Sequence, residues 1–320
     1  MHQAPSTRPR LAIIDLGTNT FHLLIVELSA GPGQPPHELL RTKAGVRLGE
    51  GGISRGEIAP EAYARALHTL AGFKEEMELH GVTQVRATAT SAVRVARNGP
   101  ALVRDISEQF GIEVEVIAGG REAELIWQGV RQAVPLGPRP QLLLDIGGGS
   151  VEFIIANDHE FFWKQSFEIG AQRLLDQFFP DPGGVLPAAA VAAEQAYFDT
   201  VLAPLVAAVQ ELKPVGLVGA SGSFDSLADM QLGRLRTEKE LPPRTELALS
   251  SFQISYAQLL SRDHAQRLAL PGILPMRADM LVVAAVLIDW VLGITGITRI
   301  QTSAFALKEG LLAEMLEQPK

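Results

Sequence analysis

The stretch from Gln141 to Asp158, QLLLDIGGGSVEFIIAND, decides the fold that we predict for this chain. An apolar run leads to Asp145, three glycines and Ser150 follow, and a second apolar run begins around Glu152. The pattern predicts a strand, a tight turn and a second strand. Glycines let backbone N–H groups crowd against an anion, and two carboxylates beside such a turn suit a divalent cation. An ordinary β-hairpin has the same pattern, so this stretch alone leaves both interpretations open.

A second copy of this pattern lies near the start of the chain. Residues Leu11 to Leu28 read LAIIDLGTNTFHLLIVEL, and they align with the first stretch without a gap, so that Asp15 falls on Asp145. Short hairpins can match in this way by chance. We adopt internal duplication as the interpretation, because the apolar runs match on both sides of the turn. Duplication predicts two similar domains that face each other, with one phosphate-binding turn from each domain across a cleft.

Strand and helix patterns alternate along the rest of the chain, as in an α/β protein. The predicted domains are residues 1–130 and 131–320, and a C-terminal helix at about residues 303–316 is expected to pack back on the first domain. The Ala-rich stretch Ala188 to Leu212 predicts one long helix with a bend at Pro204. An apolar helix is expected at Met276 to Ile294.

Composition excludes several classes of protein. Of the 320 residues, 47% are apolar, which is enough to fill two cores, and a net charge of -8 disfavours general binding to nucleic acids or membrane surfaces. The absence of cysteine excludes disulfides and thiolate metal sites and fits a reducing compartment. The first apolar run stops at Asp15, too early for a signal peptide, and the longest apolar segment is interrupted by Asp289. We therefore predict a cytoplasmic protein without nucleic-acid or membrane partners.

A basic segment breaks the acidic character of the chain. Between Val82 and Arg104 there are four arginines and no acid. A solvated basic face is the ordinary explanation for such a cluster. The alternative is an anion site, because Thr90 and Ser91 lie where a strand is expected to give way to a helix, and helix N-termini with hydroxyl groups bind anions. Arg94 would then lie about one helical turn further along.

Glu122 follows Gly119 and Gly120 and falls in the first turn of a predicted helix. Acids are favoured in first turns because they complement the helix dipole, which alone explains this residue. The functional alternative is a general base that faces the cleft.

Six segments, taken in order, resemble the Ppx/GppA family of exopolyphosphatases and guanosine pentaphosphate phosphohydrolases. The resemblance runs from about Leu11 to Leu312, through DLGTNTFHLL, ATATSAVRVARNG, GGREAELIWQGV, DIGGGSVEFII, GASGSFDSLADM and MRADMLVVAAVLI. It implies an α/β fold with two ribonuclease H-like domains around a central cleft, as in actin, sugar kinases and heat-shock chaperones. It also implies a homodimer.

Carried over residue by residue, the resemblance implies a metal-dependent site. Glu122 would be the base that activates water, and Asp145 and Glu152 would be the catalytic acidic pair that holds Mg²⁺, or Mn²⁺, or orients the water. Asp15 would be their partner metal ligand in the first domain. The implied substrate-binding residues are Gly17, Thr18, Asn19, Thr20, Thr90, Ser91, Arg94, Gly147, Gly148, Gly149, Ser150, Gly219, Ser221 and Gly222.

The chain also departs from the family pattern. Ala304 and Phe305 replace an Asp-Gly pair in the closing segment, Val151 replaces a frequent threonine, and His22 stands where many members have arginine. The chain ends at Lys320, where longer members continue into further helical domains. These differences leave the acids intact and leave open the preferred substrate and its chain length.

The resemblance implies a hydrolase that releases terminal phosphate from inorganic polyphosphate, from guanosine pentaphosphate, or from both, by metal-assisted attack of water. Action on guanosine pentaphosphate would connect the protein with the stringent response. Two alternatives stay open. An ATP-dependent kinase of the same superfamily would need an adenosine pocket near Gly219 to Ser223. A non-catalytic sensor would bind polyphosphate or guanosine alarmones without turnover.

Overall fold

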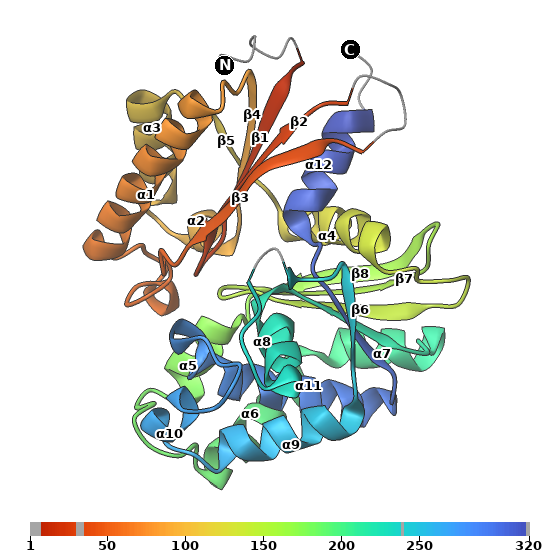
Figure 1. The fold of residues 1–320 in the computed structure, drawn as a ribbon. Coiled ribbons are helices and arrows are strands. Elements are labelled where there is room, and N and C mark those ends of the chain that lie inside the picture. Colours follow the sequence, from red (N-terminus) through yellow and green to blue (C-terminus); the bar gives the residue numbers. More distant parts are fainter. Residues whose placement is uncertain (1–7, 30–34, 238–239, 318–320) are drawn as a thin grey trace. The chain divides into compact units, whose positions relative to one another are not determined.

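The computed structural model describes residues 8–29, 35–237 and 240–317 (Figure 1). The chain divides into two compact units, Met1–Ile117 and Ala118–Lys320. The division falls just before helix α4 (Gly119–Ala133), whereas the boundary predicted between residues 130 and 131 lies within that helix.

The first unit contains a five-stranded sheet in the order β3-β2-β1-β4-β5. Strands β1 to β3 are antiparallel neighbours, and β4 and β5 continue the sheet in parallel with β1. The strands are β1 (Arg10–Leu16), β2 (Phe21–Glu27), β3 (His37–Ala44), β4 (Gln84–Ala89) and β5 (Val114–Val116). The helices are η1 (Ile53–Arg55), α1 (Pro60–Leu79), α2 (Ser91–Val95) and α3 (Gly99–Phe110).

The second unit contains a six-stranded sheet in the order β10-β11-β9-β6-β7-β8. Its strands are β6 (Gln141–Ile146), β7 (Val151–Ala156), β8 (Phe161–Phe167), β9 (Leu217–Ala220), β10 (Arg244–Leu247) and β11 (Ile300–Ser303). Besides α4, its helices are α5 (Ala171–Phe178), α6 (Ala188–Val201), α7 (Ala203–Leu212), α8 (Ser221–Leu232), α9 (Leu249–Leu260), α10 (His264–Leu268), η3 (Pro275–Arg277), α11 (Met280–Thr295) and α12 (Leu307–Glu317).

The two sheets share one plan. In the second sheet, β8-β7-β6-β9-β11 repeats the order and strand directions of β3-β2-β1-β4-β5, with β10 added as an antiparallel edge. This is the ribonuclease H-like arrangement, so the predicted fold class of two such units is confirmed. The strand registers also correspond, because Asp15 pairs with His22 and Asp145 pairs with Glu152. The predicted cleft stays a prediction.

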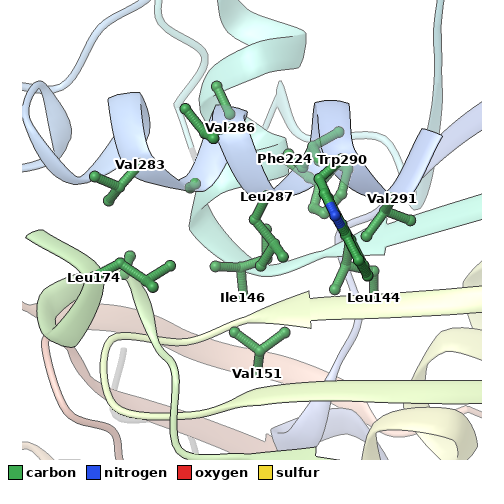
Figure 2. Close-up of a cluster of buried hydrophobic side chains, with 14 of the residues drawn as sticks. Leu144, Ile146, Val151, Leu174, Phe224, Val283, Val286, Leu287, Trp290 and Val291 are labelled. Carbon is green, nitrogen blue, oxygen red and sulfur yellow. The ribbon is translucent and has the colours of Figure 1, made fainter. Parts of the chain in front are cut away.

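Helix α11 forms the centre of the second core, as its apolar sequence predicts. Val283 and Leu287 lie on its buried surface, above Leu144 and Ile146 of β6 (Figure 2). Residues alternate between the two faces of a strand, so Asp145 lies on the opposite face of the sheet. Helices α4 and α12 cover that opposite face in Figure 1. The strand pattern therefore places the carboxylate away from the apolar core.

The long helix predicted from residue 188 to 212 is instead two helices, α6 and α7, which meet at Leu202. Pro204 lies in the first turn of α7. Proline lacks a backbone N–H group, which costs nothing at a helix start but breaks a hydrogen bond in a helix interior. The proline therefore begins a new helix instead of bending one.

Among the described residues, no helix combines the length and the apolar character that a membrane crossing requires.

Glu194 of α6 is fully buried beneath α9 and α11. Within the described chain, neither of its carboxylate oxygens has a hydrogen-bond partner. Burial raises the pKa of Glu194 from 4.5 to about 9, and the pKa of nearby Tyr256 rises to about 12, chiefly through its own burial and the charge of Asp289. Glu194 is therefore protonated in the folded protein near neutral pH.

Replacing Glu194 with methionine is expected to remove a pH dependence of stability. The unfolded chain loses this proton above its ordinary pKa, while the folded chain keeps it until about pH 9. The free energy of unfolding of the wild type should therefore fall as pH rises through this window. Between pH 5 and 7.5 the free energy of unfolding of the wild type should fall by about 3 kcal/mol relative to that of Glu194→Met.

Urea unfolding at both pH values measures this difference in the free energy of unfolding. Glu211 is exposed, so the control variant Glu211→Met should show the same pH dependence as the wild type. Equal pH dependence of Glu194→Met and wild type would contradict the expectation.

Candidate active site

Three carboxyl groups gather on the α4 face of the second sheet. Asp145 on β6 and Glu152 on β7 are direct partners in the strand register, which places their side chains side by side on one face. Glu122 reaches the same place from the first turn of α4, and its charge acts on Glu152. All three side chains are buried, with relative exposures of 5%, 1% and 6% for Asp145, Glu152 and Glu122. The structure thus brings the three predicted catalytic residues together.

The crowding of these acids perturbs their ionisation. Burial raises the pKa of Asp145 to about 6, although a hydrogen bond from Ser221 and the charge of Lys308 oppose the rise. The pKa of Glu152 lies well above its usual range because of burial first, and then because of the charges of Glu122 and Asp145. A buried acidic cluster of this kind is stabilised by a cation and is typical of functional sites.

The donor set suits a divalent ion that keeps other ligands. Within the described residues, no group of three His, Cys, Asp or Glu side chains is arranged to hold a metal by itself. Mg²⁺ commonly binds through one or two carboxylates together with water and substrate phosphate, so Asp145 and Glu152 fit this mode and a closed protein cage is unnecessary.

The glycine turn from Gly147 to Ser150 is held by the start of α5. The N–H groups of Gly170, Ala171 and Gln172 donate to the carbonyls of Gly149, Gly147 and Gly148, at 3.0, 2.9 and 2.9 Å. A Cβ atom on Gly170 would overlap the backbone of the turn. Across residues 8–29, 35–237 and 240–317, the N–H groups of Gly148 and Gly149 have no acceptor. N–H groups without an acceptor in a glycine turn can bind an anion.

The turn after β1 in the first unit is supported in the same way. The carbonyls of Thr18 and Asn19 accept hydrogen bonds from the N–H groups of Gly49 and Arg47, at 3.0 and 2.8 Å. Thr18 is buried. Both copies of the duplicated motif thus have their turn carbonyls fixed by another part of their own unit. The binding roles predicted for Asp15 and this turn stay predictions.

The basic segment of the first unit is largely neutralised. Arg86 pairs with Glu115 at 2.7 Å, Arg97 pairs with Glu57 at 3.2 Å, and Arg104 lies 4.0 Å from Asp105. A solvated, ion-paired face therefore explains these three arginines. Arg94 differs, because its Nη1 donates to the carbonyl oxygen of Ile117 at 3.0 Å. Thr90 and Ser91 are buried at the start of the short helix α2, and their predicted role with Arg94 stays a prediction.

The turn between β9 and α8 has clear packing requirements. A Cβ atom on Gly219 would overlap the ring of Phe224, and one on Gly222 would overlap the guanidinium of Arg277. Arg277 Nη1 also donates to the carbonyl oxygen of Gly222 at 2.6 Å. Packing accounts for Gly219, whereas the flexible side chain of Arg277 can move away from a Cβ atom on Gly222. The substrate-binding role of both glycines stays a prediction. Ser221 between them bonds to Asp145.

Two residues of the site were missed at the level of sequence. Ser166 on β8 lies opposite Glu152 and donates to its Oε1 at 2.7 Å. Lys308, in the first turn of α12, acts on Asp145 and pairs with Glu309 at 3.2 Å. A register argument across β7 and β8 could have found Ser166. No local pattern indicates Lys308, because its position depends on the packing of α12 against α4.

The chain is similar to known proteins over nearly its whole length. The model of the Ppx/GppA phosphatase family matches residues 24–319. Exopolyphosphatase 1 of Mycobacterium tuberculosis is 30% identical over 316 residues, which cover 96% of this chain and 88% of the relative. The crystal structure of an exopolyphosphatase from Cytophaga hutchinsonii is 44% identical, with a TM-score of 0.90 over 97% of this chain and 99% of the other. The Aquifex aeolicus PPX-GPPA enzyme is 20% identical, with a TM-score of 0.77 over 96% and 99%, and supports the fold alone.

Proposed function

Because the chain belongs to the Ppx/GppA phosphatase family, we propose that it is a hydrolase that releases terminal phosphate from inorganic polyphosphate. The observation that carries the proposal is the cluster of three buried carboxyl groups next to a glycine turn, in which the N–H groups of Gly148 and Gly149 have no acceptor among the described residues. Phosphoryl transfer to water needs a positioned water, a base and neutralisation of charge, and these residue types can supply each of them.

In this proposal, Glu122 accepts the proton of the attacking water. The N–H groups of Gly148 and Gly149 bind phosphate oxygens, and Asp145 and Glu152 hold a divalent cation, Mg²⁺ or Mn²⁺. When bound, the ion would neutralise charge on the terminal phosphate and on the leaving oxygen. Glu122 suits the role of base because it lies beside the acidic pair on a helix packed against β7 and β8.

Guanosine pentaphosphate is a second candidate substrate, because it ends in the same kind of phosphoanhydride bond. A link to the stringent response would depend on this substrate. A homodimer, which the family resemblance implies, and a cytoplasmic location, which the composition favours, belong to the same proposal. The kinase and sensor alternatives share the fold but differ in the fate of the phosphate. A kinase would transfer phosphate from ATP to an acceptor, and a sensor would bind its ligand without releasing phosphate.

Purified protein assayed with polyphosphate, guanosine pentaphosphate and ATP separates these functions. With Mg²⁺ we expect phosphate release from polyphosphate, its loss on addition of EDTA, and its return with excess Mg²⁺ or Mn²⁺. Release from guanosine pentaphosphate at a comparable kcat/KM would extend the function to that substrate. Binding of polyphosphate without release would favour the sensor. Transfer from ATP to an acceptor, without release from polyphosphate, would favour the kinase.

A further inference from the structure

A row of paired residues crosses the second sheet at the level of the acidic pair. Ala220 on β9, Asp145 on β6, Glu152 on β7 and Ser166 on β8 are successive partners in the strand register. The row therefore has a hydroxyl at each end, because Ser166 belongs to it and Ser221 directly follows Ala220. Each serine is bonded to the acid nearest to it.

Ser221 reaches its acid from an unusual backbone conformation. Its φ angle is +67°, in the left-handed region that glycine adopts readily and other residues adopt under strain. Its Oγ donates to Oδ1 of Asp145 at 2.5 Å. Strain of this kind persists where the surrounding structure enforces it, and it concentrates at functional sites. A serine at a backbone position that favours glycine indicates that its hydroxyl group has a role there.

Ser166 holds the other acid from the edge strand β8. Its Oγ donates to Oε1 of Glu152 at 2.7 Å. The two serines thus bind the two carboxylates from opposite ends of the row, and Ser150 of the glycine turn gives Glu152 a further hydrogen bond. A fixed hydrogen bond to one oxygen restricts rotation of the carboxylate and sets the direction of the other oxygen.

We propose that Ser166 and Ser221 are positioning residues, which orient Glu152 and Asp145 so that the second oxygen of each acid faces a divalent cation and its water. The inference rests on the proposed function. It reassigns Ser221, which the family resemblance placed among the substrate-binding residues, and it adds Ser166. The hydroxyl groups act through the carboxylates and need not touch the substrate.

Ser221→Gly tests the first half of this inference. Glycine keeps the backbone conformation without strain and removes the hydroxyl. We expect the Tm to rise by about 1–3 °C, while kcat and the affinity for Mn²⁺ without substrate each fall by about tenfold or more. KM for polyphosphate should change little. If the hydroxyl group of Ser221 had a purely structural role, the activity and the Tm of Ser221→Gly would change in the same direction. Unchanged kcat and unchanged Mn²⁺ affinity would overturn the inference.

Lys213→Gly is the matched control for the backbone effect. Lys213 also has a positive φ, of 47°, but it lies exposed at the C-terminal end of α7. The control should raise the Tm and leave kcat and Mn²⁺ affinity at wild-type values. A larger loss of kcat and Mn²⁺ affinity in Ser221→Gly than in Lys213→Gly is then caused by the missing hydroxyl group.

Ser166→Ala and Ser166→Thr test the second half. Alanine removes the hydroxyl, and we expect kcat and Mn²⁺ affinity to fall by about tenfold. Threonine keeps a hydroxyl and suits a strand, so it should restore most of both values. Alanine and threonine variants with equal values would overturn the role of Ser166. If the wild type released no phosphate from any substrate, the proposed function would fail, whereas the Mn²⁺ affinities would still decide the positioning roles.

Discussion

Replacing Glu122 with glutamine is expected to lower the kcat for phosphate release from polyphosphate by about 10²- to 10⁴-fold. Glutamine preserves the size of the side chain but cannot accept a proton from water. Glu122 is buried beside Glu152, and its charge contributes to the raised pKa of that acid. The substitution removes one of the crowded charges, so the folded protein should be at least as stable as the wild type.

Steady-state phosphate release and thermal unfolding, measured on the same samples, test this expectation. The KM for polyphosphate should stay within a few-fold of the wild type, since the base acts on water. Glu160→Gln is the matched control, because Glu160 is exposed in the turn between β7 and β8 and should keep wild-type activity. A Glu122→Gln enzyme with wild-type kcat would remove Glu122 from the role of base and would leave the rest of the site open to a different mechanism.

Replacing Gly129 with alanine is expected to lower the free energy of unfolding by about 2–3 kcal/mol. Helices α4 and α12 pack together along their length (Figure 1). A Cβ atom on Gly129 would overlap the carbonyl oxygen of Ala306, and one on Gly310 would overlap that of Leu125. The obstacle is backbone on both sides, so no side-chain rotation can relieve it.

Urea unfolding of Gly129→Ala and Gly120→Ala separates packing from helix propensity. Gly120 lies in the same helix with no atom within 4 Å of the position of its Cβ. Alanine there should be neutral or should stabilise by up to about 1 kcal/mol. An equal gain in the free energy of unfolding for Gly129→Ala and Gly120→Ala would contradict the expectation that close backbone packing of α4 and α12 excludes a side chain at Gly129. Loss of activity in Gly129→Ala would be consistent with displacement of Lys308, which α12 carries to Asp145.

The local sequence determined the strands, the turns and the acidic pair. Continuous apolar runs around Asp145 and Glu152 specify two buried strands, and three glycines specify the turn between them. Because the two acids flank one tight turn, their register follows from the turn itself. The match with Asp15 extended the same reasoning to the first sheet, and two sheets of similar plan are present.

The tertiary structure alone decided which distant residues join this pair. Glu122 reaches Glu152 because α4 packs on β7 and β8, and Lys308 reaches Asp145 because glycines let α12 approach α4 closely. Ser221 bonds Asp145 through a strained backbone conformation that no propensity favours in serine. Such contacts depend on how helices and strands that are far apart in the sequence pack against one another. Local sequence patterns indicate on which face of a helix or strand a residue lies, whereas packing between elements determines which residues it contacts.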